Sequence, residues 1–413
     1  MTDQFVEDAQ IPTTVEFVRE DTYGTTPTDP DYTLFADHVI SHGMTHAYNV
    51  EEQRTAGSAY ATDHKPGAEG HSASFEYFMQ QWLVDGSGDA QDAAYDGLFR
   101  ENGQLPNSHT ILTRTERSSG GNDSGGIYTI RVLKGAKIDT ASLEWVQDTG
   151  LPIPVTLDYQ VREGKRYDVH QPSSSTTLTV KSTDSSDTTQ TVTVENLDAG
   201  TSESFDLNGT TLVTSSTAFS EVGQVNVDGE TVGDVVVSVN DGNQSTPTEG
   251  ATIITINGTS SLPQGYVGER GIPLIGSGSH GSSLGDSNEE IFLGDNIERP
   301  SGTAIADNWS SGTLEVSNDL AAIPDGNQDQ FQSWQEGNAT PEVSIELFGE
   351  TVPQSIINDL KKAVQDDIVW TASGGSVTLK NAQVKSDIDD AISAGDQRVT
   401  VEPAFGGTDL TVS

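Results

Sequence analysis

Apolar and polar side chains alternate along residues 153 to 161 (IPVTLDYQV), where Val155, Leu157 and Tyr159 are apolar and the residues between them are polar. A period of two residues is typical of a strand that buries one face. The Gly-rich segment SSGGNDSGG between two such runs predicts a hairpin. The runs that share this pattern are 11–19, 72–79, 109–116, 127–133, 153–161, 314–323 and 342–348. We therefore expect a mainly β protein.

A few segments depart from the strand pattern. A short helix is predicted at 89–99, where apolar residues recur on one side. An amphipathic helix is predicted at 352–368, preceded by a T-x-x-Q capping box that begins at Thr351. A further short helix is predicted at 387–394. Residues 36–72 are rich in Gly, Thr, Asp and His with weak periodicity, which predicts a long extended loop.

The composition of the sequence changes at residue 173. From there Ser and Thr become frequent, and short predicted strands alternate with turns. Asn208-Gly209, Asp228-Gly229 and Asp241-Gly242 are turn signals at the spacing of a small β-sandwich. We predict an immunoglobulin-like β-sandwich at 173–262, inserted into a discontinuous β domain formed by 1–172 and 263–413.

The composition and charge of the chain indicate the environment in which the protein works and the partners it can bind. The chain has 413 residues, 33% of them hydrophobic, and its 63 acidic and 20 basic residues give a formal net charge of −43. Such a surface suits molar salt, where the Debye length falls to ~3 Å and self-repulsion is screened. The sequence therefore indicates a halophile or a virus of one. A chain this acidic could neutralise few phosphates, so specific nucleic-acid binding is not expected.

The sequence contains no cysteine, which excludes disulfides and thiolate metal sites. The N-terminal residues have neither the basic region nor the apolar core of a signal peptide, and no apolar run has the length of a membrane span. We therefore expect a protein that is made in a cytoplasm and is not inserted into a membrane.

Several residues are candidate ligands of metal ions or of a dinucleotide. His38, His42 and His46 would share one face of a helix, as in a zinc site, but Val39, Ile40 and Gly43 disfavour a helix, so loop histidines are the favoured interpretation. The residue sets considered for other ligands are Asp184/Asp187 and Asp228/Asp234 for calcium, and Gly276, Gly278 and Gly281 for a dinucleotide. Neither acidic pair completes a calcium loop, and no helix pattern follows the glycines, so solvated surface and a flexible loop are favoured.

Candidate catalytic residues are not found by sequence. There is no G-x-S-x-G elbow, and no pair of carboxylates stands out among 63 acidic residues as a glycosidase pair. The prediction is therefore a protein without catalytic, cofactor-binding or metal-binding residues, and not an enzyme.

Three segments together resemble the tail tube proteins of long-tailed viruses. The first is VEFVREDTYGTTPTDPDY at 15–32. The second is the strand at 72–79 followed by GIYTIRVLKGAKIDTASLEWVQDTGLPIPVTLDYQV at 126–161. The third is GTLEVSNDLAAIPDGNQDQFQSWQEGNATPEVSIELFGE at 312–350. The resemblance lies in the order of strands and turns. It covers roughly 1–171 and 300–413, and it is interrupted by the insertion at 173–262 and by a long Gly-rich stretch at 263–300.

The resemblance implies a structural virion protein of a virus that infects a halophilic archaeon. It implies a β-sandwich or partial barrel with one or two flanking helices, which forms stacked hexameric rings around a continuous inner β-barrel. Viral DNA would pass through the lumen without specific binding, and the other partners would be tape-measure, neck and baseplate proteins. Residues 36–72 would contact the next ring and become ordered there, the helix at 352–368 would cover the outer face, and the insert would project outward.

Two other hypotheses about the function stay open. One is a haloarchaeal cell-surface or adhesin protein that binds through its immunoglobulin-like module, although no signal peptide or anchor is seen. The other is a polysaccharide hydrolase, which would need a carboxylate pair with a raised pKa in a cleft.

Overall fold

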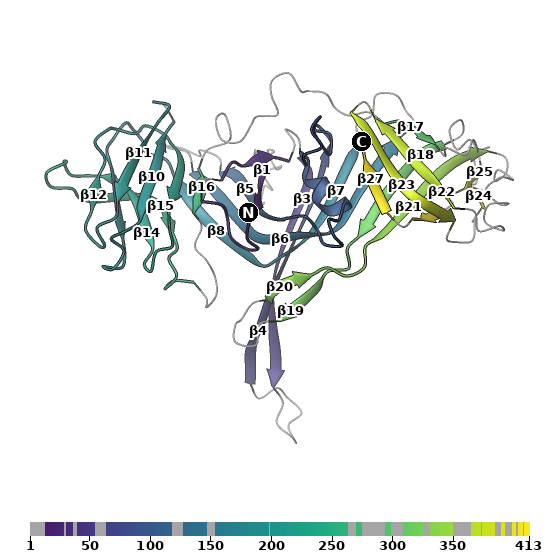
Figure 1. The fold of residues 1–413 in the computed structure, drawn as a ribbon. Helices are drawn as coiled ribbons and strands as arrows, with labels where there is room; N and C mark the ends of the chain where they lie inside the picture. Colours follow the sequence, from purple (N-terminus) through teal and green to yellow (C-terminus); the bar gives the residue numbers. More distant parts are fainter. Residues whose placement is uncertain are drawn as a thin grey trace, which may run out of the picture.

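The protein is mainly β, with several antiparallel sheets and one short helix in the described part of the chain (Figure 1). The computed structural model describes residues 13–28, 30–35, 39–53, 63–117, 127–146, 153–197, 199–262, 270–274, 294–298, 309–324, 331–349, 365–372, 374–384, 390–392, 399–401, 404–407 and 409–413. In Figure 1 a β-sandwich lies at one end, a group of C-terminal strands at the other, and a long hairpin projects from the body between them.

The N-terminal sheet has the order β1-β5-β6-β8, with β2 on the outer edge of β1. Its strands are β1 (Thr13–Glu20), β2 (Thr33–Leu34), β5 (Ser108–Arg117), β6 (Ile127–Val146) and β8 (Glu163–His170). The predicted hairpin is confirmed, because β5 and β6 pair in antiparallel register from Arg117↔Ile127 to His109↔Ala136.

Strand β6 belongs to two sheets. Its first part pairs with β5 and β8, and its second part pairs with β7 (Pro154–Val161) and β18 (Trp309–Ser317). Gly135 lies where the strand changes partners, at a φ of 60° that favours glycine. A Cβ at this position would lie 2.8 Å from the Cβ of Arg162, so only glycine, which has no side chain, fits where β6 changes partners.

The second sheet runs β3-β4-β7-β6-β18-β21, where β3 is Val39–Gln53, β4 is Asp63–Phe78 and β21 is Thr340–Gly349. The C-terminal strands β17 (Gly294–Glu298), β22 (Asp366–Ala372), β23 (Gly375–Val384) and β27 (Asp409–Val412) pair in that order. The indole rings of Trp145 on β6 and Trp370 on β22 pack with centroids 5.9 Å apart, within one buried cluster that joins both groups. The remaining short strands are β19 (Ala321–Pro324), β20 (Phe331–Gln335), β24 (Asp390–Ile392), β25 (Val399–Val401) and β26 (Ala404–Gly406).

The strands between residues 178 and 273 form two 4-stranded sheets, ordered β11-β10-β13-β16 and β12-β9-β14-β15. Their strands are β9 (Leu178–Ser182), β10 (Thr191–Asn196), β11 (Thr201–Asp206), β12 (Val213–Thr214), β13 (Val222–Val227), β14 (Val235–Asn240), β15 (Glu249–Ile256) and β16 (Gly271–Pro273). Strand β16 pairs with β13 although it lies beyond the predicted boundary at 262. The buried cluster of these sheets also contains Leu112, Ile130 and Tyr167 of the N-terminal sheet, so the two parts share apolar packing.

The helix predicted at 89–99 is confirmed as α1, Ala93–Leu98, with Asp92 as its N-cap. The loop predicted at 36–72 is wrong where the structure describes it, because β3 and β4 are paired strands. Of the helix predicted at 352–368, residues 352–364 lie outside the described residues. The prediction is wrong for residues 366–368, because they begin strand β22. This strand buries Ile368, Trp370 and Ala372 in alternation. Residues 390–392 of the helix predicted at 387–394 likewise form strand β24.

None of the helices that the structure describes has the length and apolar character needed to cross a membrane.

Candidate functional surface

One side of the sheet β4-β7-β6-β18-β21 is apolar and buried, and the other is polar. Residues that alternate with the buried ones lie on the opposite face, and the cross-strand register aligns them from strand to strand. We call this side the acidic face. Its residues are Ser72, Ser74 and Glu76 of β4, Thr156, Asp158 and Gln160 of β7, Thr140, Ser142 and Glu144 of β6, Ser311, Thr313 and Glu315 of β18, and Glu342, Ser344 and Glu346 of β21.

The acidic face carries hydroxyl groups and carboxylates, and among its described positions Lys137 is the basic exception. Lys137 lies opposite Gln160 at one end of the face, where its Nζ donates to the carbonyl of Trp334 at 3.1 Å and pairs with Glu336. Glu315 and Glu342 lie directly opposite each other on β18 and β21. Like charges in that position destabilise a sheet, so this arrangement is not one that folding alone favours.

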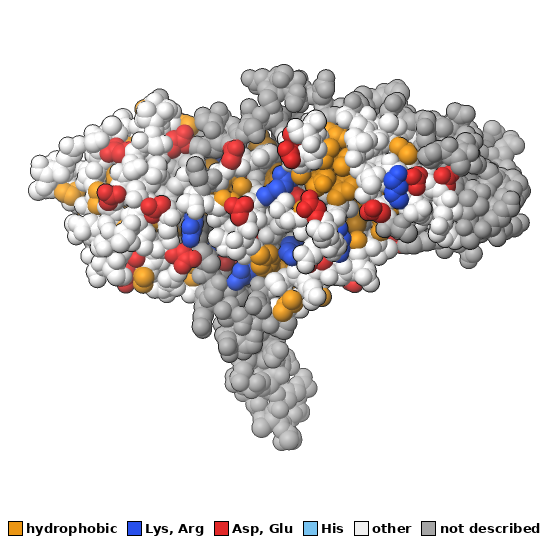
Figure 2. All heavy atoms as spheres, in the orientation of Figure 1, with side chains coloured by type: hydrophobic (Ala, Val, Ile, Leu, Met, Phe, Trp, Pro, Cys, Tyr) orange, Lys and Arg blue, Asp and Glu red, His pale blue; other side chains and the backbone are white. Residues whose placement is uncertain are grey.

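The relief of the acidic face is shallow. A hollow of about 130 Å³ is lined by Thr313, Glu315, Glu342, Val343 and Ser344. A hollow of this size is below the usual range of about 300–1,000 Å³ for small-molecule sites. The face is therefore better suited to an extended contact or to solvent than to a small substrate. Asp and Glu side chains are also spread over the sandwich and the body on the side of the molecule seen in Figure 2.

The hairpin β3–β4 leaves the body as a two-stranded ribbon. β4 is flanked by β7 only from His71 to Phe78, whereas its pairing with β3 continues past Ala47↔Gly70 to Gln53↔Asp63. Figure 1 shows this ribbon projecting away from the sheets. Among the described strands, β3 has no partner on its other edge. An isolated ribbon is marginally stable in water, and its open edge can pair with another chain.

The candidate zinc ligands His42 and His46 lie on β3, in the part of the hairpin that β7 flanks, and His38 is outside the described residues. His42 and His46 belong to strand β3 and not to a helix, so about 13 Å of extended chain separates them at ~3.3 Å per residue. Burial, followed by the charge of Arg131, lowers the pKa of His42. Among the described residues, no group of three or more His, Asp or Glu is placed to hold a metal ion.

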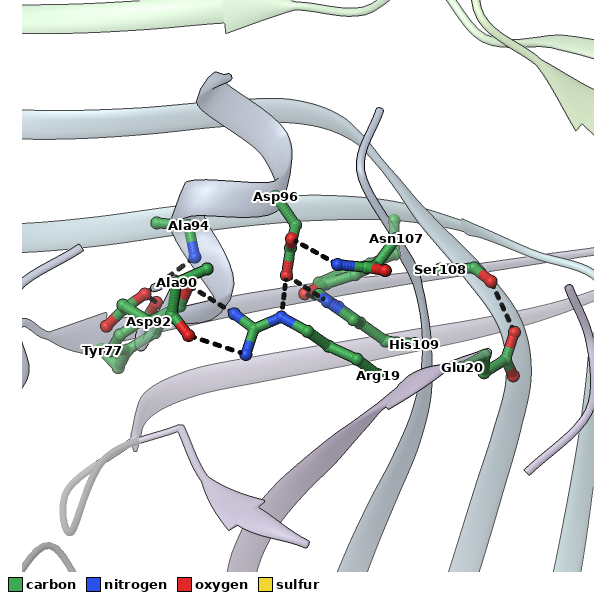
Figure 3. A network of polar contacts seen from close by, with 11 residues as sticks. Arg19, Glu20, Tyr77, Ala90, Asp92, Ala94, Asp96, Asn107, Ser108 and His109 are labelled. Atoms are coloured by element: carbon green, nitrogen blue, oxygen red, sulfur yellow. Dashed lines mark hydrogen bonds and ion pairs between the residues drawn. The ribbon is translucent and has the colours of Figure 1, made fainter. Parts of the chain in front are cut away.

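Behind the acidic face, a buried polar network fastens α1 to the sheet (Figure 3). Asp96 of α1 accepts from Arg19 Nε at 2.6 Å, from His109 Nε2 at 2.8 Å and from Asn107 Nδ2 at 3.2 Å. The other ring nitrogen of His109 lies 3.0 Å from the hydroxyl of Tyr159 on β7. Arg19 also donates to the carbonyl oxygens of residues 90 and 92 at 3.2 and 3.1 Å, so strand β1 holds both ends of the turn that begins the helix.

Asp92 ties the helix start to β4. Its Oδ1 accepts from the backbone N–H of Ala94 at 2.8 Å and from the hydroxyl of Tyr77, which lies on the buried face of the sheet. Burial raises the pKa of Asp92 to about 6, although both hydrogen bonds act to lower it. Burial and the neighbouring Asp92 charge raise the pKa of Tyr77, and burial and the charge of Asp96 raise that of Tyr159.

Asp96 shows the opposite shift. Burial alone would raise its pKa, but the hydrogen bond and charge of His109 and the pairing with Arg19 outweigh burial and lower it. Nearby, both oxygens of Glu20 accept hydrogen bonds, from Ser108 Oγ at 2.6 Å, Thr110 Oγ1 at 2.8 Å and the N–H groups of Gly24 and Gly135. These groups are satisfied by one another deep in the protein, which is the arrangement of a structural network.

Asp184 and Asp187, one of the two candidate calcium pairs, differ in their surroundings. Asp187 is 1% exposed, and its oxygens accept from Ser182 Oγ and from the N–H groups of Val232 and Gly233, both at 2.9 Å. Asp184 accepts from Ser186 at the surface, and these bonds lower its pKa. The expectation of a solvated surface is therefore wrong for Asp187, whose carboxylate is a structural acceptor. Gly276, Gly278 and Gly281 lie outside the described residues.

Two further hollows lie elsewhere. A groove of about 570 Å³ runs between β8 and β15 and includes Arg166, Asp168 and His170, with Arg166 and Asp168 paired at 3.2 Å. A smaller hollow of about 220 Å³ is formed beside α1 by Leu98, Phe99 and Leu410, among other residues. Neither is lined by Asp92, Asp96 or His109, so no described hollow gives a substrate access to the buried network.

No protein-family model matches this chain, and a search of curated proteins finds no match either.

Sequence reasoning did not find the acidic face or the buried network. The polar residues of each alternating run indicate that each strand has a polar side. The extent of the acidic face depends on which strands pair, and the periodicity of the sequence does not predict that pairing. For the network, the one readable signal was Asp92, an acidic residue directly before a short apolar helix.

Proposed function

We propose that this chain is a structural virion protein that assembles into the tail tube of a virus of a halophilic archaeon. In the proposed assembly, copies form stacked hexameric rings, and the acidic face lines the lumen through which DNA passes. The observation that carries the proposal is the acidic face itself: a continuous antiparallel surface of hydroxyls and carboxylates on the side of the sheet opposite a buried apolar cluster.

Electrostatics supports the proposal that the acidic face is directed toward the lumen. A wall of carboxylates repels a phosphate backbone, and in molar salt the repulsion acts only within a few Å, so DNA can slide without being held. Glu315 and Glu342 place like charges directly opposite each other on the sheet. Their presence is understandable if charge on this surface has a use beyond folding.

The ribbon and the open edge of β3 support self-assembly. A neighbouring copy that pairs with β3 would satisfy its unpaired backbone groups, and rings are the closed solution for head-to-tail contacts. The projecting ribbon would reach the next ring. The sandwich would lie on the outside, and the tube ends would meet the other tail proteins. We assign the chain no enzymatic role.

Electron microscopy of the purified full chain in molar KCl tests the assembly. We expect rings and stacked tubes at high protein concentration. A chain that remains a monomer across the concentration range would refute the proposal, and binding of such a monomer to haloarchaeal cells would favour the adhesin alternative.

Charge reversal tests the lumen assignment. Glu144→Lys with Glu315→Lys places positive charge on the acidic face, and we expect assembled tubes to retain duplex DNA in a co-sedimentation assay. The matched control is Asp206→Lys with Glu230→Lys, which makes the same charge change on exposed positions of the sandwich. Equal DNA retention by both variants would contradict the assignment.

A further inference from the structure

The dipeptide Asn-Gly occurs at 102–103, 208–209 and 257–258. It is the pair most open to a self-reaction of the backbone, because glycine has no Cβ to keep its nitrogen from the side-chain carbonyl of the preceding Asn. The reaction needs the glycine N–H to be free and the chain to move around it. The structure places these pairs in very different surroundings.

Two of the pairs are held in the sandwich. Gly209 is buried, and its N–H donates to the carbonyl oxygen of Asp187 at 2.8 Å. Gly258 is also buried, and its N–H donates to Asp234 Oδ1 at 2.9 Å. A Cβ at either glycine would meet backbone atoms, at 2.8 Å for Gly209 and 2.1 Å for Gly258, which shows how closely the surrounding chain packs. Neither nitrogen is available without local opening.

The pair at 102–103 is exposed. Asn102 and Gly103 form the tip of a tight turn closed by hydrogen bonds between Glu101 and Gln104, with φ values of 53° and 83°. Apart from Gly103 and its two chain neighbours, no atom lies within 4 Å of the position of a Cβ on Gly103. Among the described residues, the Gly103 N–H donates no backbone hydrogen bond. The nucleophile and its target are therefore adjacent and unhindered.

We propose that Asn102 is a site of spontaneous deamidation in the folded protein. Gly103 N attacks Asn102 Cγ, the new N–C bond closes a succinimide, and the side-chain nitrogen leaves as ammonia after taking up the amide proton. Water then opens the ring at either carbonyl and gives aspartate or isoaspartate. The reaction needs no oxidant, reductant or enzyme, and each event adds one negative charge.

The product alters a defined contact. The carbonyl oxygen of Gly103 accepts from Arg100 Nη1 at 3.3 Å, and the same guanidinium binds the carbonyl oxygen of Gly337 at 2.8 Å and Asn318 Oδ1 at 3.0 Å. An isoaspartyl linkage lengthens the backbone of the turn by one atom and displaces the Gly103 oxygen. The Arg100 bonds to residues 318 and 337 do not pass through the turn and remain.

Peptide mapping by mass spectrometry tests the proposal on the full chain, incubated at mildly alkaline pH in molar KCl. We expect the peptide with Asn102 to gain about one dalton at least about tenfold faster than the peptides with Asn208 and Asn257, because those sites react only after local opening. In urea, where all three sites are free, the rates should converge to within about threefold. Equal rates in the folded chain, or the same ranking in urea, would overturn the assignment.

Asn102→Gly is the control variant. It removes the reacting amide and keeps a residue that adopts the left-handed φ of this turn. The gain of mass and the acidic species seen by ion exchange should disappear in this variant, while slow reaction at Asn208 and Asn257 continues. Persistence of the acidic species would show that it arises elsewhere and would refute the proposal.

Discussion

His109 Nε2 lies 2.8 Å from Asp96 Oδ2, and both side chains are about 1% exposed. This contact joins strand β5 to helix α1, and Arg19 of β1 shares the same carboxylate oxygen at 2.6 Å. The carboxylate thus connects elements that are far apart in the sequence. Its low pKa shows that the surroundings favour the charged form in spite of burial.

Substitution of Asp96 is expected to be among the most damaging single changes. Asp96→Asn leaves Arg19 and His109 facing an amide, and removal of one partner from a buried charged pair lowers the free energy of unfolding by about 3–5 kcal/mol. Urea unfolding in fixed KCl measures the effect. Asp168→Asn, which breaks the exposed pair with Arg166, is the control and should lose no more than about 1 kcal/mol. Similar losses in both variants would contradict the role of the network.

Asp92 is expected to make the protein less stable as the pH rises. The pKa of Asp92 in the folded protein, about 6, lies above the ordinary value of 3.8. The contribution of Asp92 to the free energy of unfolding is therefore complete below about pH 4 and is lost as the pH rises through about 6. The difference of about two units corresponds to about 3 kcal/mol. Asp96, whose pKa is lowered, acts in the opposite sense and only toward more acidic pH.

The measurement is the free energy of unfolding of the wild type and of Asp92→Asn between about pH 4 and about pH 7. The amide oxygen can still accept from Tyr77 and Ala94 but does not titrate. The difference between the two curves should therefore change by about 3 kcal/mol across this window. Parallel curves would show that Asp92 does not titrate in it.

Shortening the ribbon is expected to separate folding from stacking. Ala47 and Gly70 face each other across the hairpin, so replacing residues 48–69 by Asn-Gly closes the strands with a two-residue turn. Because β4 is flanked by β7 from His71 onward, the body should keep its free energy of unfolding within about 1 kcal/mol. Under the proposed function, electron microscopy should show rings that no longer stack. Tubes of normal length would exclude the ribbon from ring-to-ring contact.

Asp187 is expected to act as an acceptor and not as a calcium ligand. Asp187→Ala leaves the N–H groups of Val232 and Gly233 without their acceptor, which should lower the free energy of unfolding by about 3 kcal/mol. Asp206→Ala, at an exposed position, should change it by less than about 0.5 kcal/mol. Addition of a calcium chelator should leave the thermal midpoint unchanged; a clear fall would indicate an ion at the site.

Alternation predicted the strands that have one buried face. Residues 154–161 became β7 with alternating exposure, and the hairpin of β5 and β6 followed from two runs around a Gly-rich turn. The same reasoning missed β3 because its sequence, VISHGMTHAYNVEEQ, shows no regular apolar period. Its Gly, Thr and His residues therefore resemble a loop.

Tertiary context explains the other differences. Asp366, Asp367 and Ile368 continued a helical pattern in sequence, but pairing of β22 with β17 and β23 buries Ile368 beside Trp370. Periodicity also could not foresee that Asp96 would meet Arg19, 77 residues earlier in the chain. The opposed Glu315 and Glu342 became visible only once β18 and β21 were paired.

The passage of β6 from one sheet to the other has a mechanical consequence. A pull on either sheet is carried to its neighbour by the covalent backbone of a single strand, and not by side-chain packing that could slip. Separating the sheets would require rupture of ladders on both flanks of that strand. The body of the molecule should therefore resist load as one unit. Under the proposed function, this stiffness would keep the bore of the tube constant while DNA is driven through it.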